Sequence, residues 1–123
     1  MTLTCLVSGA SARQREAAIA RAVALLPPEE SVACILEGLA DANSPLQALT
    51  DNPHHHVQRI APGCPCCAGN LVMRVTLNRL LRPAPNHLFV SIANREHREQ
   101  VHQFLGSPPY DNYLTLQEDL VLR

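Results

Sequence analysis

Three cysteines near the middle of the sequence are its strongest candidates for chemistry. Cys64, Cys66 and Cys67 lie in the segment GCPCC, where glycine and proline favour an exposed turn. Thiolates bind zinc and other borderline or soft divalent ions, and a helix that follows the turn would favour the charged form of the thiols. The segment therefore predicts a site for zinc or another divalent transition metal.

The same three cysteines allow a second chemistry. Cys64 and Cys67 have the C-x-x-C spacing that can close a disulfide, and Cys66 is then available for thiol exchange. A thiol redox module is thus an alternative to a metal site. As a metal site the segment offers at most three ligands, whereas a closed tetrahedral zinc site needs four. An exchangeable site is expected, or an ion shared between two copies.

Three consecutive histidines precede the cysteines and are also metal ligands by type. His54, His55 and His56 lie eight to ten residues before Cys64. A strand over 56–60 would carry them away from the cysteines by about 3.3 Å per residue. This spacing favours a second, weaker metal site over one compact site, and a solvated loop is the alternative.

The turn after the first expected strand has the place of a phosphate-binding loop. If Gly9 is the first glycine of G-x-x-x-x-G-K-[ST], the last three positions read Gln14, Arg15 and Glu16. The second glycine, the lysine and the hydroxyl are all replaced. All ten basic residues of the chain are arginine, and a carboxylate at Glu16 would repel phosphate. Gly9 is at most a remnant nucleotide-binding residue, so we expect neither bound GTP and magnesium nor GTP hydrolysis.

Alternating strands and helices are expected to position these residues. The expected strands are apolar runs bounded by turn residues, at 2–7, 31–36, 56–60 and 87–93, with a last short strand near the C-terminus. The expected helices lie at 11–26, 71–81 and 95–105. This pattern predicts one α/β domain over residues 1–123, with three layers: an open, mostly parallel sheet of four to five strands and helices on both of its faces.

Capping signals and hydrophobic spacing refine two of the helices. Ser11 and Gln14 have the spacing of a capping box at the start of the first helix. In the second helix we expect one apolar face, made by Leu71, Val75 and the Leu80–Leu81 pair.

The composition argues against several classes of partner. The formal net charge is −1 and the chain has only two Tyr, two Phe and no Trp, so a nucleic-acid-binding surface is not expected. No apolar run reaches the length of a membrane span, and the start MTLTCLVSG lacks the features of a signal peptide. We expect no nucleic-acid or membrane partner and a cytoplasmic protein with reduced thiols.

The cysteine segment and its surroundings resemble a known family. GCPCC looks like the G-C-x-C-C signature of the CobW-type GTPases, metallochaperone relatives of the nickel-insertion GTPases of urease and hydrogenase. Residues 57–81 are similar to the strand, cysteine loop and helix of that family, and residues 87–105 to its next strand and helix. Glu37 and Gly38 stand where the family's second strand ends. The resemblance covers most of the chain in order, and the cysteine motif is its specific part.

The resemblance implies a P-loop NTPase-like fold and a metal role for the three cysteines, which the family associates with zinc or cobalt. The phosphate loop departs from the family pattern. Residues 91–94 read SIAN in place of a Glu-Thr-Ser-Gly-like switch, and the sequence stops before the guanine-specificity motif. We expect metal homeostasis, or delivery of an ion to a target protein or within a homodimer, without GTPase activity. The alternatives are a non-catalytic pseudo-GTPase interaction module and the thiol redox module.

Overall fold

Strands and helices alternate along the chain, as the apolar runs predict. The computed structural model describes residues 2–9, 11–38, 44, 46, 52–60, 68–93 and 98–122, with the side chains of 68–72 left out. The elements are β1 (Thr2–Gly9), α1 (Ala12–Ala24), β2 (Val32–Glu37), β3 (His55–Ile60), α2 (Ala68–Leu80), β4 (His87–Ile92), α3 (Arg98–Leu105), a 3₁₀ turn (Tyr110–Asn112), β5 (Leu114–Leu116) and β6 (Leu120–Leu122).

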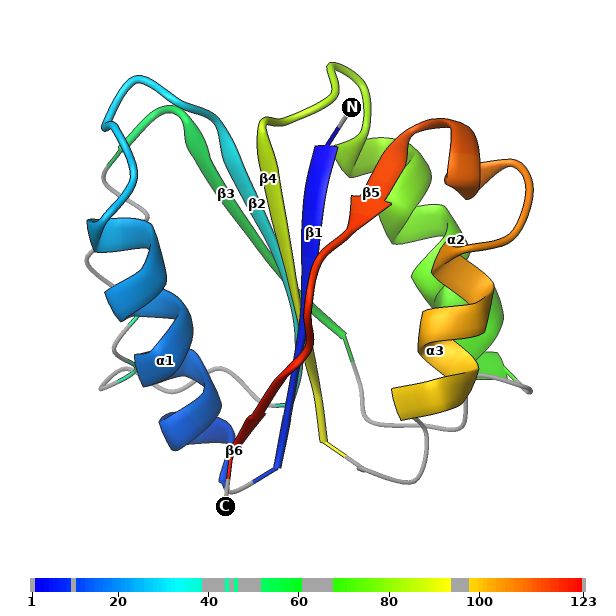
Figure 1. Ribbon diagram of the computed structural model, residues 1–123, viewed down its shortest axis with the longest axis horizontal. Helices are drawn as coiled ribbons and strands as arrows, with labels where there is room; N and C mark the ends of the chain where they lie inside the picture. Colours follow the sequence, from blue (N-terminus) through cyan, green and yellow to red (C-terminus); the bar gives the residue numbers. More distant parts are fainter. Residues whose placement is uncertain are drawn as a thin grey trace.

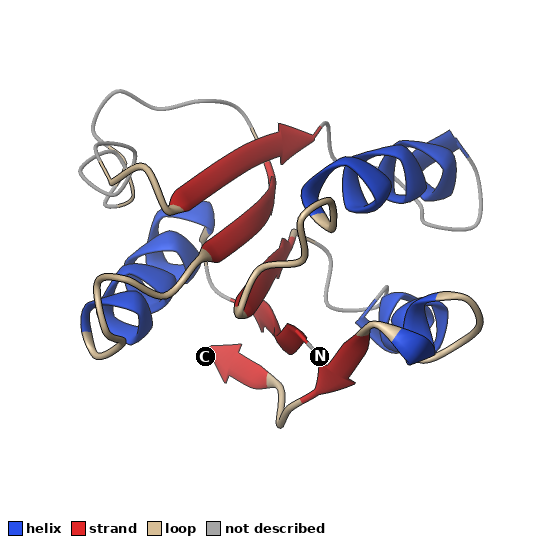
Figure 2. Cartoon of the chain, turned by 90° about the horizontal axis from the view of Figure 1, so that it is seen from above, coloured by secondary structure: helices blue, strands red, loops and turns tan. Residues whose placement is uncertain are grey.

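The strands form one sheet, in the order β3-β2-β4-β1-β5, with β6 also beside β1. All the pairings among these strands are parallel. β5 lies along the first half of β1 and β6 along its second half, so the sheet has six strands rather than four to five. Figure 2 shows the strands as a central layer with helices on both sides. The α/β class and the open, mostly parallel sheet are confirmed.

The helices cover both faces of the sheet and bury a separate core on each. α1 lies on one face, and α2 and α3 lie on the other (Figure 1). On the α1 side, Ile19 and Val23 pack against Leu36 and its neighbours in the sheet. On the other side, Leu77 and Leu105 pack against the opposite faces of the same strands. The central strands β2 and β4 are therefore buried on both faces, as is usual in parallel sheets.

The start of α1 follows directly from its sequence. The backbone N–H of Gln14 donates to Ser11 Oγ over 3.2 Å, and the backbone N–H of Ser11 donates to Gln14 Oε1 over 3.0 Å. This is the expected capping box. The helix ends at Ala24, two residues earlier than expected, because Pro27 disfavours the helical conformation at the residue before it.

The apolar face expected for α2 is partly wrong. Val75 is 51% exposed, whereas Met73 and Leu77 are buried, with Leu80 and Leu81 packed beside them. Val75 is two positions from both Met73 and Leu77, which places it about 200° around the helix from each. The core-facing stripe therefore follows the Met73–Leu77 spacing and leaves Val75 on the outside.

Candidate functional site at the carboxyl ends of the strands

The carboxyl ends of the strands meet at one edge of the sheet, where parallel α/β folds bind ligands. β1 and β4 are neighbours, and the helices that follow them, α1 and α3, lie on opposite faces (Figure 1). This divergence marks the crevice position of an open α/β sheet. Gly9 lies at this point, at the end of β1.

Gly9 packs closely against the C-terminal strand β6. Its φ is +88°, and a Cβ at this position would lie 2.0 Å from the carbonyl oxygen of Leu122 in β6. Only glycine fits this close approach. Its carbonyl also accepts a hydrogen bond of 3.2 Å from Nη1 of Arg15. The structure thus gives Gly9 a role in the fold, while a role in nucleotide binding stays a prediction.

Arg15 occupies the position of the phosphate-loop lysine and is directed into the protein. Its side chain is on the first turn of α1 and is only 3% exposed. Nε donates to Ser91 Oγ at the end of β4 over 2.9 Å. Burial lowers the pKa of the guanidinium, while the negative charges of Glu37 and Glu16 act in the opposite direction. Arginine stays protonated in proteins, so Arg15 is a buried cation within a polar cluster.

Glu16 is held by an ion pair with the end of β3. Its carboxylate accepts two hydrogen bonds from the Arg59 guanidinium, of 2.9 and 3.1 Å, and a further one from the Ser44 hydroxyl. Burial by itself would raise the pKa of this carboxyl. The hydrogen bonds from Arg59 and Ser44 and the charges of Arg59 and Arg15 outweigh burial, and the pKa lies below its ordinary value. Glu16 is therefore ionised at neutral pH.

The four charged residues of this cluster balance each other. Arg15 and Arg59 contribute two positive charges, and Glu16 and Glu37 contribute two negative charges, so their formal sum is zero. Glu37 is the last residue of β2 and is 4% exposed. A phosphate site needs an excess of positive charge and free backbone N–H groups. The described part of this edge instead holds a neutral, internally bonded cluster, here called the buried ion cluster.

Sequence reasoning identified Arg15 and Glu16 but missed Arg59 and Ser91. Arg59 follows Val57 at a spacing of two, so both side chains lie on the face covered by α1. A charged residue on a covered face of a parallel sheet requires a counter-charge nearby. That requirement is a signal in the sequence, although it does not say which carboxylate responds.

The three cysteines lie outside the described residues. Their segment begins after Ile60, at the end of β3, and leads to Ala68, where α2 starts. A strand and a helix flank the segment as expected, although α2 begins at Ala68 rather than at 71. The segment therefore follows the carboxyl end of β3. Among the residues that the structure describes, no three histidine, cysteine or acidic side chains are grouped so that they could hold a metal ion. The cysteine site stays a prediction.

The three histidines lie at the other edge of the sheet. β3 begins at His55, and the strand carries the chain about 13 Å from His56 to Ile60 before the cysteine segment starts. Alternation along the strand directs His55 to the α1 face and His56 to the α2 face. Neighbouring histidines on opposite faces cannot share one ion easily. A second metal site at His54, His55 and His56 therefore stays a prediction without grouped ligands in its support.

The comparisons with known proteins add no relative. No helix among the described residues is long and apolar enough to cross a membrane. No family model, curated protein or solved structure matches the chain, so the CobW-type resemblance continues to depend on the motif residues alone.

Proposed function

We propose that this protein binds zinc or a similar divalent transition-metal ion through Cys64, Cys66 and Cys67. It would act in metal homeostasis or delivery, without GTPase activity. The observation that carries the proposal is the place of the cysteine segment, between the carboxyl end of β3 and the start of α2. Three thiols in four positions are thereby attached to the edge of the sheet where α/β proteins place their ligands.

The start of α2 supports thiolate chemistry in this segment. The helix has 13 residues and begins directly after Cys67, at Ala68. The positive end of a helix dipole favours negative charge within its first turn, and lowers the pKa of a cysteine placed there. Thiolates are the form that binds zinc.

The two remaining cysteines are poor candidates for the same chemistry. Burial raises the pKa of Cys34 to about 12, and the nearby charge of Glu16 adds to this rise. Burial also raises the pKa of Cys5, which is partly exposed on β1. Both thiols therefore stay protonated at neutral pH, and metal binding falls to the cysteine segment.

Loss of GTPase activity is supported by the buried ion cluster. A nucleotide phosphate at the end of β1 would have to separate Arg15 from Ser91 and Gly9, and would face the ionised Glu16 carboxylate.

Three thiolates leave one position of a tetrahedral zinc site open. A target protein, or a second copy of the chain, would supply the missing ligand, which suits the transfer of an ion.

Metal content tests the proposal directly. The untagged protein, purified reduced and without chelator, should carry about one equivalent of zinc, cobalt or nickel, or about half if two copies share the ion. The triple variant Cys64, Cys66 and Cys67→Ser should lose it, whereas the matched control Cys5→Ser should keep it. Elemental mass spectrometry measures both.

Two results would contradict the metal site. Retention of the ion by the triple variant would place the ligands elsewhere. Failure of the wild type to take up micromolar metal would leave the interaction-module and redox alternatives. Thiol counting at defined potentials then separates these two, because only a redox module forms a reversible Cys64–Cys67 disulfide.

A further inference from the structure

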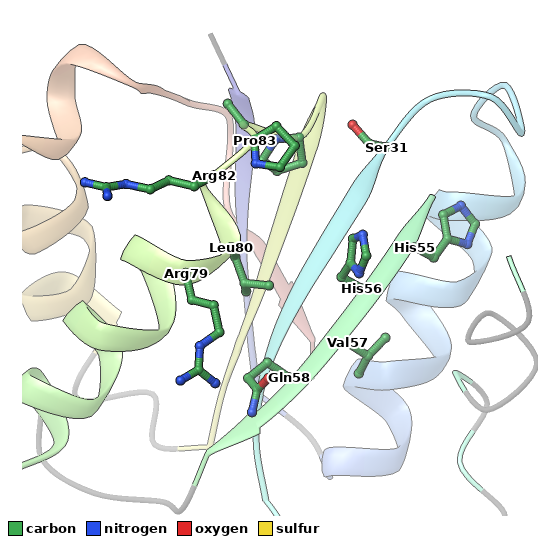
Figure 3. A pocket seen from close by; sticks show the side chains of 11 residues that line it. Ser31, His55, His56, Val57, Gln58, Arg79, Leu80, Arg82 and Pro83 are labelled. Carbon is green, nitrogen blue, oxygen red and sulfur yellow. The ribbon is translucent and has the colours of Figure 1, made fainter. Parts of the chain in front are cut away.

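A groove lies toward the amino-end edge of the sheet, beside β3. It has a volume of about 480 Å³ and runs between β3 and the C-terminal end of α2 (Figure 3). This volume falls within the range of small-molecule sites. Its floor is apolar, with Leu80 of α2 and the prolines that precede β4 among its lining.

The polar lining of this groove is cationic and donor-rich. His56 and Gln58 come from the same face of β3, and Arg79 comes from the last turn of α2, followed by Arg82. Figure 3 shows Gln58 and Arg79 on the two sides of the space between β3 and α2, with Arg82 extending away from β3 at its rim. Among the described residues, none that lines the groove is a carboxylate.

Arg79 and Arg82, like the exposed Arg21, have no counter-charge among the described residues, whereas three other arginines do. Arg15, Arg59 and Arg98 each lie near a carboxylate. Within the part of the chain that the structure describes, the guanidinium groups of Arg79 and Arg82 have no hydrogen bond or ion pair. The helix dipole explains a cation in the last turn of α2, but not why Arg79 lines the same groove as His56 and Gln58.

We infer that this groove binds a small, doubly charged oxyanion, of the phosphate-monoester or dicarboxylate class. Arg79 would supply a forked pair of donors, and Gln58 and His56 would supply further N–H groups from β3. Planar guanidinium groups match both carboxylate and phosphate oxygens, and charge-assisted hydrogen bonds are the strong ones. This role uses His56 as a donor and so competes with its use as a metal ligand.

Anion titration of the metal-free protein tests the inference. Inorganic phosphate and malonate are the two probes, followed by calorimetry and by the shift in melting temperature at constant ionic strength. The wild type should bind at least one of them with a Kd of about 1 mM or below. Arg79→Gln and His56→Gln should each weaken binding about tenfold.

Matched controls keep the result specific. Arg21→Gln removes one positive charge from the exposed face of α1 and should leave the affinity unchanged. The Cys64, Cys66 and Cys67→Ser variant should bind the anions like the wild type, so failure of the metal proposal and failure of this one are separable. Preference for phosphate assigns a phosphate-bearing ligand, and equal or tighter binding of malonate assigns a carboxylate-bearing one.

Three outcomes would overturn the inference. The first is no binding of either anion up to about 10 mM. The second is an equal loss of affinity in Arg21→Gln and Arg79→Gln, which would mean attraction by net charge alone. The third is full affinity in the folded Arg79→Gln and His56→Gln variants, with folding checked by circular dichroism.

Discussion

The two ends of the sheet use the same residue type in opposite ways. At the carboxyl ends of the strands, Arg15 is buried and Arg59 is partly buried. Both are bonded to neighbours and balanced by Glu16 and Glu37. At the amino ends, Arg79 lines an open groove whose described lining contains no carboxylate. Arg15 and Arg59 therefore stabilise the folded protein, whereas the charge of Arg79 is available for a ligand.

This difference shows that the place of a site and its chemistry are separate properties. The carboxyl-end edge has the position of a nucleotide site, but its cations are already satisfied within the fold. At the amino-end edge, Glu30 is paired with His87, and Arg79 and Arg82 have no ion pair among the described residues. Electrostatic balance, rather than position alone, tells which edge can attract an anion.

Removing the carboxylate of the buried ion cluster should have the largest effect. Glu16→Gln keeps the shape of the side chain but deletes the charge that faces Arg59 and Arg15. Breaking a buried pair from one side lowers the free energy of unfolding by about 3 kcal/mol, because the desolvated partner loses its counter-charge. Urea denaturation of the two proteins measures the difference.

Arg79→Gln is the matched test at the other end of the sheet. Its side chain is exposed, so the free energy of unfolding should change by less than about 0.5 kcal/mol. A loss in Arg79→Gln as large as that in Glu16→Gln would show that both edges are structural, and the contrast between them would be wrong.

The contact between Gly9 and β6 should give the next largest effect. Gly9→Ala places a Cβ 2.0 Å from the Leu122 carbonyl oxygen at a φ of +88°. Strain of this kind costs about 2 kcal/mol of unfolding free energy. Amide exchange should also show that β6 loses protection in this variant.

Gly38→Ala separates strain in the backbone from the clash. Gly38 has a φ of +137°, but the nearest atom that its Cβ would meet is 4.0 Å away. Gly38→Ala should lower the free energy of unfolding by less than Gly9→Ala does. The amides of β6 should keep their protection from exchange. Equal losses would mean that the close approach of β6 contributes nothing.

Acid should weaken the contribution of Glu16 to stability. The pKa of Glu16 is lower in the folded protein than its ordinary value. The stability that Glu16 contributes is therefore complete above the unfolded pKa, about 4.3, and is lost as the pH falls through the lower, folded pKa. The gap in unfolding free energy between wild type and Glu16→Gln should be constant from about pH 5 to 7 and should shrink below about pH 4.

Urea denaturation across this pH range checks the prediction. The other carboxyls titrate in both proteins, so the gap isolates Glu16. A gap that is the same at pH 3 and pH 7 would show that the ion pair with Arg59 does not depend on the charge of Glu16.

The elements that the sequence predicts well are those with local signals. The capping box needs only the three-residue spacing of Ser11 and Gln14, and β4 is a compact apolar run between turn residues. β6 could not be predicted with the same certainty, because three residues carry no periodic pattern. It is a strand because it pairs with Val7–Gly9, more than one hundred positions earlier.

The position of the candidate site could be predicted from the sequence, but the side chains that meet there could not. Gly9 and the first turn of α1 follow from the strand–turn–helix pattern. The partner of Glu16 is 43 positions away in the sequence, and the choice of Arg59 depends on which strand lies beneath α1. Side chains that meet only through tertiary packing have no characteristic spacing in the sequence. The groove beside Arg79 has no sequence signature for the same reason.

The pairing of β1 has a consequence for how the protein folds. β1 lies between β4 on one side and β5 and β6 on the other, so all its neighbours come from residues 87–122. β1 is therefore synthesised long before any strand that can hold it. Contacts between such distant segments close large loops and slow the search for the native state. β1 thus leaves the ribosome well before β4, β5 and β6, and it is paired on both sides only after these later strands are made.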